Sequence, residues 1–151
     1  MHRTSKKLGE ILMEKGLINQ EQLDDSLNEQ KTTKEFLGAI LLKNGHIEEQ
    51  GLFQALSEQF RIPFISIEYK YIDWDFVSHF SSSLILDCKC FPIQINESMI
   101  TVAIVNPLDV WALKKVEQAT IGYSLRLVLV CESDMKEVIS RYKDYTKGRH
   151  R

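Results

Sequence analysis

Residues 7–30 read KLGEILMEKGLINQEQLDDSLNEQ, and residues 36–59 read FLGAILLKNGHIEEQGLFQALSEQ. Aligned without a gap, these two 24-residue stretches carry the same residue at ten positions, and the five residues KTTKE separate them. An internal repeat indicates that one supersecondary unit occurs twice. The shared pairs are Leu8/Leu37, Gly9/Gly38, Ile11/Ile40, Leu12/Leu41, Gly16/Gly45, Ile18/Ile47, Leu23/Leu52, Leu27/Leu56, Glu29/Glu58 and Gln30/Gln59.

Spacing within the first copy predicts a pair of helices. Leu8 and Leu12 lie four residues apart, as two residues on one face of a helix do. Gly16 stands where a helix ends in a left-handed residue, a conformation that glycine adopts without a Cβ clash. Asn19 followed by Gln22 has the form of a capping box, which predicts the start of a second helix.

The second copy repeats this design with one weaker signal. Gly45 is its helix stop, and Leu52 and Leu56 repeat the apolar stripe of copy one. Glu48 replaces the asparagine of the capping box. We therefore predict that residues 1–60 form four helices, arranged as two tandem helical hairpins, with breaks near residues 16, 30–34 and 45. Thr33 is predicted to cap the third helix.

Beyond Pro63 the apolar period changes from helical to alternating, which predicts a separate sheet-bearing part. The fold class is α+β, with a helical subdomain over 1–60 and an α/β subdomain over 61–151 that together form one domain. The predicted order is βαββαβ with a C-terminal helix, as in a ferredoxin-like sheet, although order alone leaves strand pairing open. Trp74 and Trp111 each begin a helix and are predicted to be packing anchors. The predicted elements are strand 64–67, helix 74–86, strands 91–95 and 99–105, helix 109–120, strand 125–130, and a helix from Ser133 to Tyr145.

Composition excludes several classes of protein. The chain has 151 residues, of which 44% are hydrophobic and 26% are charged. Its net charge of −2 gives no indication that it binds a polyanion. No apolar run reaches the ~18 residues that a membrane span needs. The odd cysteine count, Cys88, Cys90 and Cys131, suits a reducing cytoplasm. Cys88 and Cys90 form C-x-C, but no second cysteine pair or nearby histidine completes a metal site.

Catalysis and DNA binding find no support in the sequence. There is no GxxxxGK(S/T) phosphate loop and no histidine placed to activate a cysteine or serine, so we predict that the chain is not an enzyme. Paired short helices also occur in DNA readers, but the second helix of copy one carries Glu21, Asp24, Asp25 and Glu29 without a basic residue before Lys31. Acidic helices repel the phosphates on which DNA affinity depends.

Two pairs of shared positions admit both a structural and a functional interpretation. Gly9 and Gly38 stand near helix starts, where glycine costs ~1 kcal/mol relative to alanine. Their recurrence indicates a close approach by either a neighbouring helix or a ligand. Gln30 and Gln59 end the copies, and their amides are either solvated or read the edge of a ligand.

The doubled pattern (R/K)LGxxLxxxGxIxxxxLxxxLxxQ, with its five-residue spacer, resembles the MshE N-terminal (MshEN) domain. Domains of this family form the N-terminal region of the ATPases of type II secretion and type IV pilus assembly. Residues 60–145 resemble the rest of the domain through FRIPFISIE, ITVAIVNPLD and ESDMKEVISRY. The resemblance implies a receptor for cyclic di-GMP, whose two guanines and two phosphates suit a site built from two like halves.

The resemblance also implies which residues contact the ligand. Lys7 keeps the basic opening of the motif, whereas Phe36 departs from it and takes the place of a charged phosphate contact. Arg3, Lys6 and Asp109 are candidate helpers. The implied ligand-binding residues are Lys7, Leu8, Gly9, Leu12, Gly16, Leu23, Leu27, Gln30, Phe36, Leu37, Gly38, Leu41, Gly45, Leu52, Leu56 and Gln59.

Two functions of different classes are therefore compatible with the sequence. The first is a cyclic di-GMP receptor linked to type II secretion or type IV pilus machinery. The second is a protein-interaction domain of such an ATPase, which keeps the fold, binds no nucleotide and docks on an inner-membrane assembly partner. Position one of each motif, Lys7 and Phe36, discriminates between them.

Overall fold

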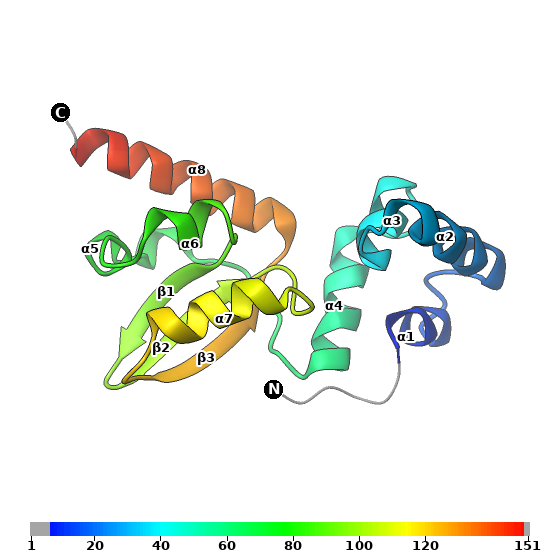
Figure 1. Cartoon of the computed structure of the whole chain (residues 1–151), viewed down its shortest axis with the longest axis horizontal. Helices are drawn as coiled ribbons and strands as arrows, with labels where there is room; N and C mark the ends of the chain where they lie inside the picture. Colours follow the sequence, from blue (N-terminus) through cyan, green and yellow to red (C-terminus); the bar gives the residue numbers. More distant parts are fainter. Residues whose placement is uncertain (1–6, 150–151) are drawn as a thin grey trace. The chain divides into compact units, whose positions relative to one another are not determined.

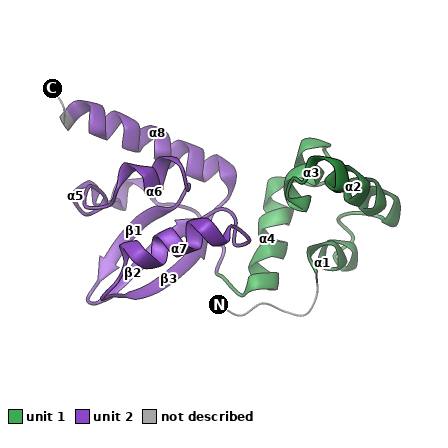
Figure 2. Cartoon of the chain, in the orientation of Figure 1, with its two compact units in different colours: residues 1–62 green, residues 63–151 purple. Residues whose placement is uncertain are grey.

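The computed structural model describes residues 7–149, and the chain divides into two compact units, Met1–Ile62 and Pro63–Arg151 (Figure 2). The first unit contains helices α1 (Leu8–Glu14), α2 (Gln20–Thr33), α3 (Leu37–Lys43) and α4 (Glu49–Phe60) (Figure 1). Its described part, residues 7–62, contains no strand, as the helical spacing of the repeat predicted. Within residues 7–149, no helix is long and apolar enough to cross a membrane.

The predicted helix ends of the repeat are confirmed. Gly16 and Gly45 have φ angles of +72° and +73°, the left-handed conformation that ends α1 and α3. Asn19 Oδ1 accepts a hydrogen bond from the backbone N–H of Gln22, and the Gln22 side chain accepts one from the backbone N–H of Asn19. Glu48 makes no such side-chain cap at the start of α4.

The prediction for Thr33 is wrong. α2 runs through Thr33 and ends because Lys34 adopts a left-handed conformation with φ of 61°. The Thr33 hydroxyl therefore donates back to the carbonyl of Glu29 within the last turn of α2. The N-cap position of α3 is occupied by Phe36, which provides no side-chain cap.

The second unit contains a three-stranded mixed sheet in the order β1 (Phe91–Asn96), β2 (Met99–Ile104), β3 (Ser124–Leu129). β1 and β2 form an antiparallel hairpin, and α7 (Val110–Ala119) connects β2 to the parallel strand β3. Asp109 caps α7 by accepting a hydrogen bond from the backbone N–H of Ala112 at 3.0 Å. The remaining helices are η1 (Tyr69–Tyr71), α5 (Trp74–Val77), α6 (Ser82–Leu86) and α8 (Glu132–Arg149).

Two local expectations for this unit are wrong, and the structure also decides the strand pairing that the sequence left open. The segment 64–67 forms only an isolated parallel bridge between Phe64 and Leu129, on the outer side of β3. A ferredoxin-like order would place that segment between β2 and β3, but those two strands pair directly because α7 crosses straight from one to its neighbour. The helix expected over 74–86 is two short helices, since Ser81 caps a new helix by accepting from the N–H of Leu84.

The two tryptophans have different environments. Trp74 is a packing anchor, as predicted: its ring stacks on Tyr145 of α8 at 5.4 Å and meets Phe91 of β1 edge-on at 5.9 Å. Trp111 is not an anchor, because 76% of its surface is exposed. The core of the unit instead consists of smaller side chains from α6, the sheet, α7 and α8, among them Ile85, Val102, Ala103, Ile104, Val116, Val128, Leu129, Met135 and Val138.

Candidate functional site

The two shared glycines at the helix starts allow the two helices of each copy to touch. A Cβ atom on Gly9 would lie 2.8 Å from the Leu23 Cδ1 atom of α2, and one on Gly38 would lie 2.7 Å from the Leu52 Cδ1 atom of α4. Both distances are shorter than side-chain packing tolerates. A neighbouring helix, one of the two alternatives left open by the sequence, therefore accounts for both glycines.

The two copies also pack on each other in a reciprocal way. α1 packs on α4, and α2 packs on α3. Exchanging the copies converts the first contact into the second, because α1 is equivalent to α3 and α2 to α4. The repeat therefore forms a unit with approximate two-fold symmetry rather than two independent hairpins.

Side-chain contacts between the two copies follow the same approximate two-fold symmetry. Lys15 of copy one forms an ion pair with Glu58 of copy two. At the equivalent positions, Asn44 of copy two donates a hydrogen bond of 3.1 Å to Glu29 of copy one. The shared glutamates thus each bind the other copy. Lys43 also contacts Glu29 at 2.9 Å, and this hydrogen-bonded cation holds the pKa of the Glu29 carboxyl below its ordinary value.

A second pair of equivalent contacts shows where the symmetry is imperfect. Leu17 of copy one lies over Gly51 of α4, 3.1 Å from the position of a Cβ atom on that glycine. The equivalent residues, His46 and Gln22, meet through polar atoms, with Gln22 Nε2 3.4 Å from His46 Nδ1. The same inter-copy position is therefore apolar on one side and polar on the other.

The motif residues singled out from the sequence divide by exposure. Those that the structure buries belong to the core of the helical unit: Leu8, Gly9, Leu12, Gly38, Leu41, Leu52, Leu56 and Gln59. Half-buried positions are Leu23, Gln30, Phe36 and Leu37. Exposed positions are Lys7, Gly16, Leu27 and Gly45. Arg3 and Lys6 lie outside the described residues.

The openings of the two motifs differ in structure as well as in sequence. Lys7 is exposed at the N-cap position of α1. Phe36 occupies the equivalent position of α3, and its ring turns back over the helix, so that Cε1 would lie 2.8 Å from a Cβ atom on Gly38. Copy two therefore presents an aromatic ring where copy one presents a cation.

The two shared glutamines also differ. The Gln30 amide donates a hydrogen bond of 3.1 Å to the carbonyl of Glu35, in the linker between the copies. Gln59 is only 7% exposed, and among the described residues its Oε1 atom has no hydrogen-bond partner. A buried acceptor without a partner costs about 1–3 kcal/mol, so Gln59 is a side chain that a ligand with N–H donors would satisfy.

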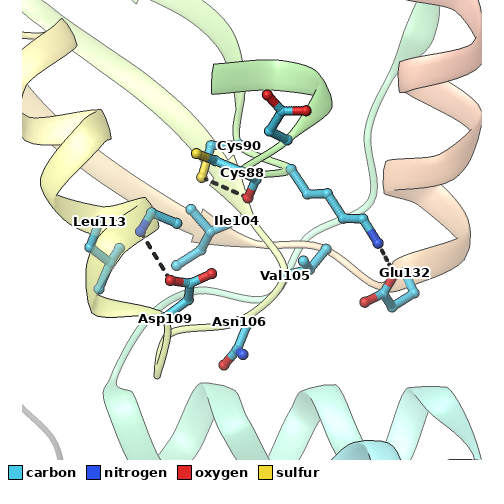
Figure 3. A pocket seen from close by; sticks show the side chains of 11 residues that line it. Cys88, Cys90, Ile104, Val105, Asn106, Asp109, Leu113 and Glu132 are labelled. Carbon is cyan, nitrogen blue, oxygen red and sulfur yellow. Dashed lines mark hydrogen bonds and ion pairs between the residues drawn. The ribbon is translucent and has the colours of Figure 1, made fainter. Parts of the chain in front are cut away.

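The sheet unit contains its own pocket of about 260 Å³, and Asp109 is one of the residues that line it (Figure 3). Cys88 and Cys90 also line this pocket. So do Lys89 and Glu132, which form an ion pair with 3.9 Å between the ammonium nitrogen and a carboxylate oxygen. Burial, together with the nearby Cys88 and Asp109, raises the pKa of the Cys90 thiol to about 12. No group of three or more metal-ligating side chains exists among the described residues. The sequence did not single out this pocket because its walls come from segments far apart in the chain.

The comparisons with known proteins extend over both units. The family model of the MshEN domain matches residues 60–149. The structure of MshE with cdg, cyclic di-GMP, is similar with a TM-score of 0.81 at 26% sequence identity, covering 91% of this chain and 99% of that one.

The N-terminal domain of XpsE is similar in two crystal forms, with TM-scores of 0.71 and 0.57, each at 20% identity and covering 94% of this chain and 99% of that one. No curated protein matches. The family match spans most of the chain, including all of the sheet, and the likeness to MshE extends over the helical repeat as well. On this evidence the chain belongs to the MshEN domain family.

Proposed function

We propose that this protein is a regulatory receptor for cyclic di-GMP, in which motifs 7–30 and 36–59 each contribute half of the binding surface. The observation that carries the proposal is the reciprocal packing of the two copies, α1 on α4 and α2 on α3. Cyclic di-GMP is itself made of two like halves. The likeness to MshE with cdg, at a TM-score of 0.81, supports the same ligand.

Residues with free or accessible groups are the proposed ligand contacts. Lys7 offers a cation to a phosphate, and the half-buried Leu37 offers apolar surface to a purine face. The Gln59 Oε1 atom is buried and has no hydrogen-bond partner among the described residues, so the N–H donors on the edge of guanine would reach it only if the Gln59 side chain moves. The buried leucines and glycines of the motifs hold the surface in shape rather than provide it.

We further propose that residues 1–60 and 61–151 act together as one domain of a type II secretion or type IV pilus ATPase. The role assigned to this domain is regulatory, because the two motifs contribute a surface for a ligand. Asp109 is retained only as a candidate helper, since its carboxylate caps α7 in the second unit.

Calorimetric titration with cyclic di-GMP and with GMP tests the receptor function. Joining two half-ligands makes the second contact intramolecular, so the cyclic dinucleotide is expected to bind far more tightly than GMP. Lys7→Ala should weaken binding without unfolding the protein, since Lys7 is exposed. Equal affinities for GMP and cyclic di-GMP would contradict a two-half site.

Phe36 favours a second candidate function, a protein-interaction domain that binds no nucleotide. Its ring covers the helix start at Gly38, where a charged opening residue would leave the backbone accessible. The fold likeness to the XpsE N-terminal domain is compatible with either function. Absence of any heat of binding with cyclic di-GMP, for both the wild type and a Phe36→Arg variant, would favour this second function.

A further inference from the structure

Helix α7 begins with an exposed apolar projection, which we call the Trp111 knob and define as Leu108, Val110, Trp111 and Lys114. The first three side chains are 42%, 63% and 76% exposed. The Lys114 ammonium lies 6.0 Å from the centre of the Trp111 ring, so a cation lies beside the aromatic surface of the knob. An exposed tryptophan among aliphatic neighbours is typical of a protein–protein contact.

The opposite end of α7 borders a cavity of about 380 Å³, which we call the α5 groove. Its apolar walls include Phe76, Phe80 and Tyr123, and Ile100 of β2 contributes a buried side chain. Ala119, the last residue of α7, also lines it. Ile95 of β1, which lines the groove, is 40% exposed, and Ile121, in the turn between α7 and β3, is 78% exposed.

The polar groups of the groove are mainly hydrogen-bond acceptors. Asp73 and Asp75 lie at its edge, and no lysine or arginine is among the described residues that line it. His79 Nδ1 lies 2.8 Å from the carbonyl oxygen of Asp75. Because a carbonyl oxygen can only accept, that ring nitrogen is the donor of this hydrogen bond. The groove therefore suits an apolar group that brings a cation with it.

We propose that the Trp111 knob of one copy docks in the α5 groove of a second copy. The knob presents an exposed aromatic ring with the Lys114 cation beside it, whereas the groove is concave, aromatic and rimmed by Asp73 and Asp75. A copy cannot fill its own groove, because Trp111 and Ala119 are eight residues apart on one rigid helix, about 12 Å along its axis. The contact is therefore head to tail, and each bound copy keeps one free knob or groove for another.

Sedimentation velocity of the full chain tests this contact. We expect the weight-average sedimentation coefficient to rise with concentration at low salt, and to rise less at high salt, because exposed charges are screened. Trp111→Ala removes the knob, and Ala119→Lys places a cation in the groove; both positions are exposed. Each change should weaken association at least about 30-fold, as truncation of a central interface tryptophan does. Unchanged melting temperatures will show that both variants are folded.

Tyr71→Ala is the matched control. Tyr71 is 73% exposed and has the Lys70 ammonium 5.1 Å from its ring, yet it belongs to neither surface. This variant should associate as the wild type does.

A mixture of the two interface variants gives the decisive result. The Ala119→Lys copy keeps its knob and the Trp111→Ala copy keeps its groove, so the mixture should form dimers and nothing larger, while each variant alone stays monomeric. A wild type that remains monomeric at every concentration overturns the proposal and leaves the groove to a different partner. A mixture that remains monomeric, or a Tyr71→Ala variant as weak as Trp111→Ala, overturns it equally.

Discussion

Ser26 and Ala55 stand at the same position of the two copies, and both are buried. The Ser26 hydroxyl has no hydrogen-bond partner among the described residues, whereas Ala55 has no polar atom to satisfy. We expect Ser26→Ala to raise the free energy of unfolding by about 1 kcal/mol, since it removes a desolvated donor and leaves no large cavity. Urea unfolding measures the change. Ala55→Ser is the matched control and should lower stability by a similar amount.

Cys90 allows a prediction about reactivity. Burial raises the pKa of its thiol to about 12 from an ordinary value of 9.0, so in the folded protein it carries almost no thiolate at pH 8. We expect iodoacetamide at pH 8 to alkylate the half-buried Cys88 and Cys131 first, and Cys90 only after unfolding. Peptide mass spectrometry reads the order of labelling.

The raised pKa of Cys90 also fixes the direction of a pH effect on stability. The folded state keeps the Cys90 proton to higher pH than the unfolded state does. The stability that this group contributes is therefore fully present below pH 9 and is lost as the pH rises towards about 12. A Cys90 that is labelled as fast as Cys88 in the folded protein would contradict both statements.

Lys7 is the residue on which ligand affinity depends in the proposed function. Arginine binds phosphate through a planar fork, whereas lysine acts as a point charge on a flexible stem. We expect Lys7→Arg to tighten cyclic di-GMP binding by ~1–2 kcal/mol, and Lys7→Ala to weaken it. Titration of the three proteins at low and high salt measures this, and the loss in Lys7→Ala should shrink at high salt. Equal affinities across the series would show that Lys7 is only a solvated residue.

At the scale of elements, the ends of α1 and α3 depend on a conformation that few residues adopt. Gly16 and Gly45 have positive φ angles, and a Cβ atom on either would meet nothing within 4 Å. The cost of Gly16→Ala or Gly45→Ala is therefore one of backbone strain alone, about 1 kcal/mol of unfolding free energy each. Gly148→Ala is the control, because that glycine lies in α8 without a positive φ and in open space. It should be neutral or slightly stabilising in the same unfolding experiment.

At the scale of the whole molecule, a ligand that binds the folded repeat must raise its stability. At a free concentration of about 100 times its dissociation constant, cyclic di-GMP should add about 2.7 kcal/mol. For a chain of this size that corresponds to a rise of roughly 5–10 °C in melting temperature, measured by a thermal shift. GMP at the same concentration is expected to produce a much smaller rise, since it engages one half of the surface at a time. No shift with either nucleotide would move the assignment to the protein-interaction domain.

Local signals were sufficient to predict the helical repeat. The glycine stops at Gly16 and Gly45 and the capping box of Asn19 depend on residues no more than four positions away, so the sequence alone locates them. The change of period at Pro63 likewise indicated a sheet in the second unit. The doubled motif within residues 7–59 predicted the MshEN family, although the family model itself matches the part of the chain that follows it, residues 60–149.

Contacts between distant residues decided the rest. The sequence could not show that Leu23 covers Gly9, or that Glu29 and Glu58 each bind the opposite copy, because these contacts arise only when the four helices pack. Pairing of β2 with β3, and the exposure of Trp111, also depend on how α7 crosses the sheet. Turn and capping preferences act within a few residues, so sequence determines most elements of this protein, whereas only the tertiary structure determines which of their side chains remain free to bind.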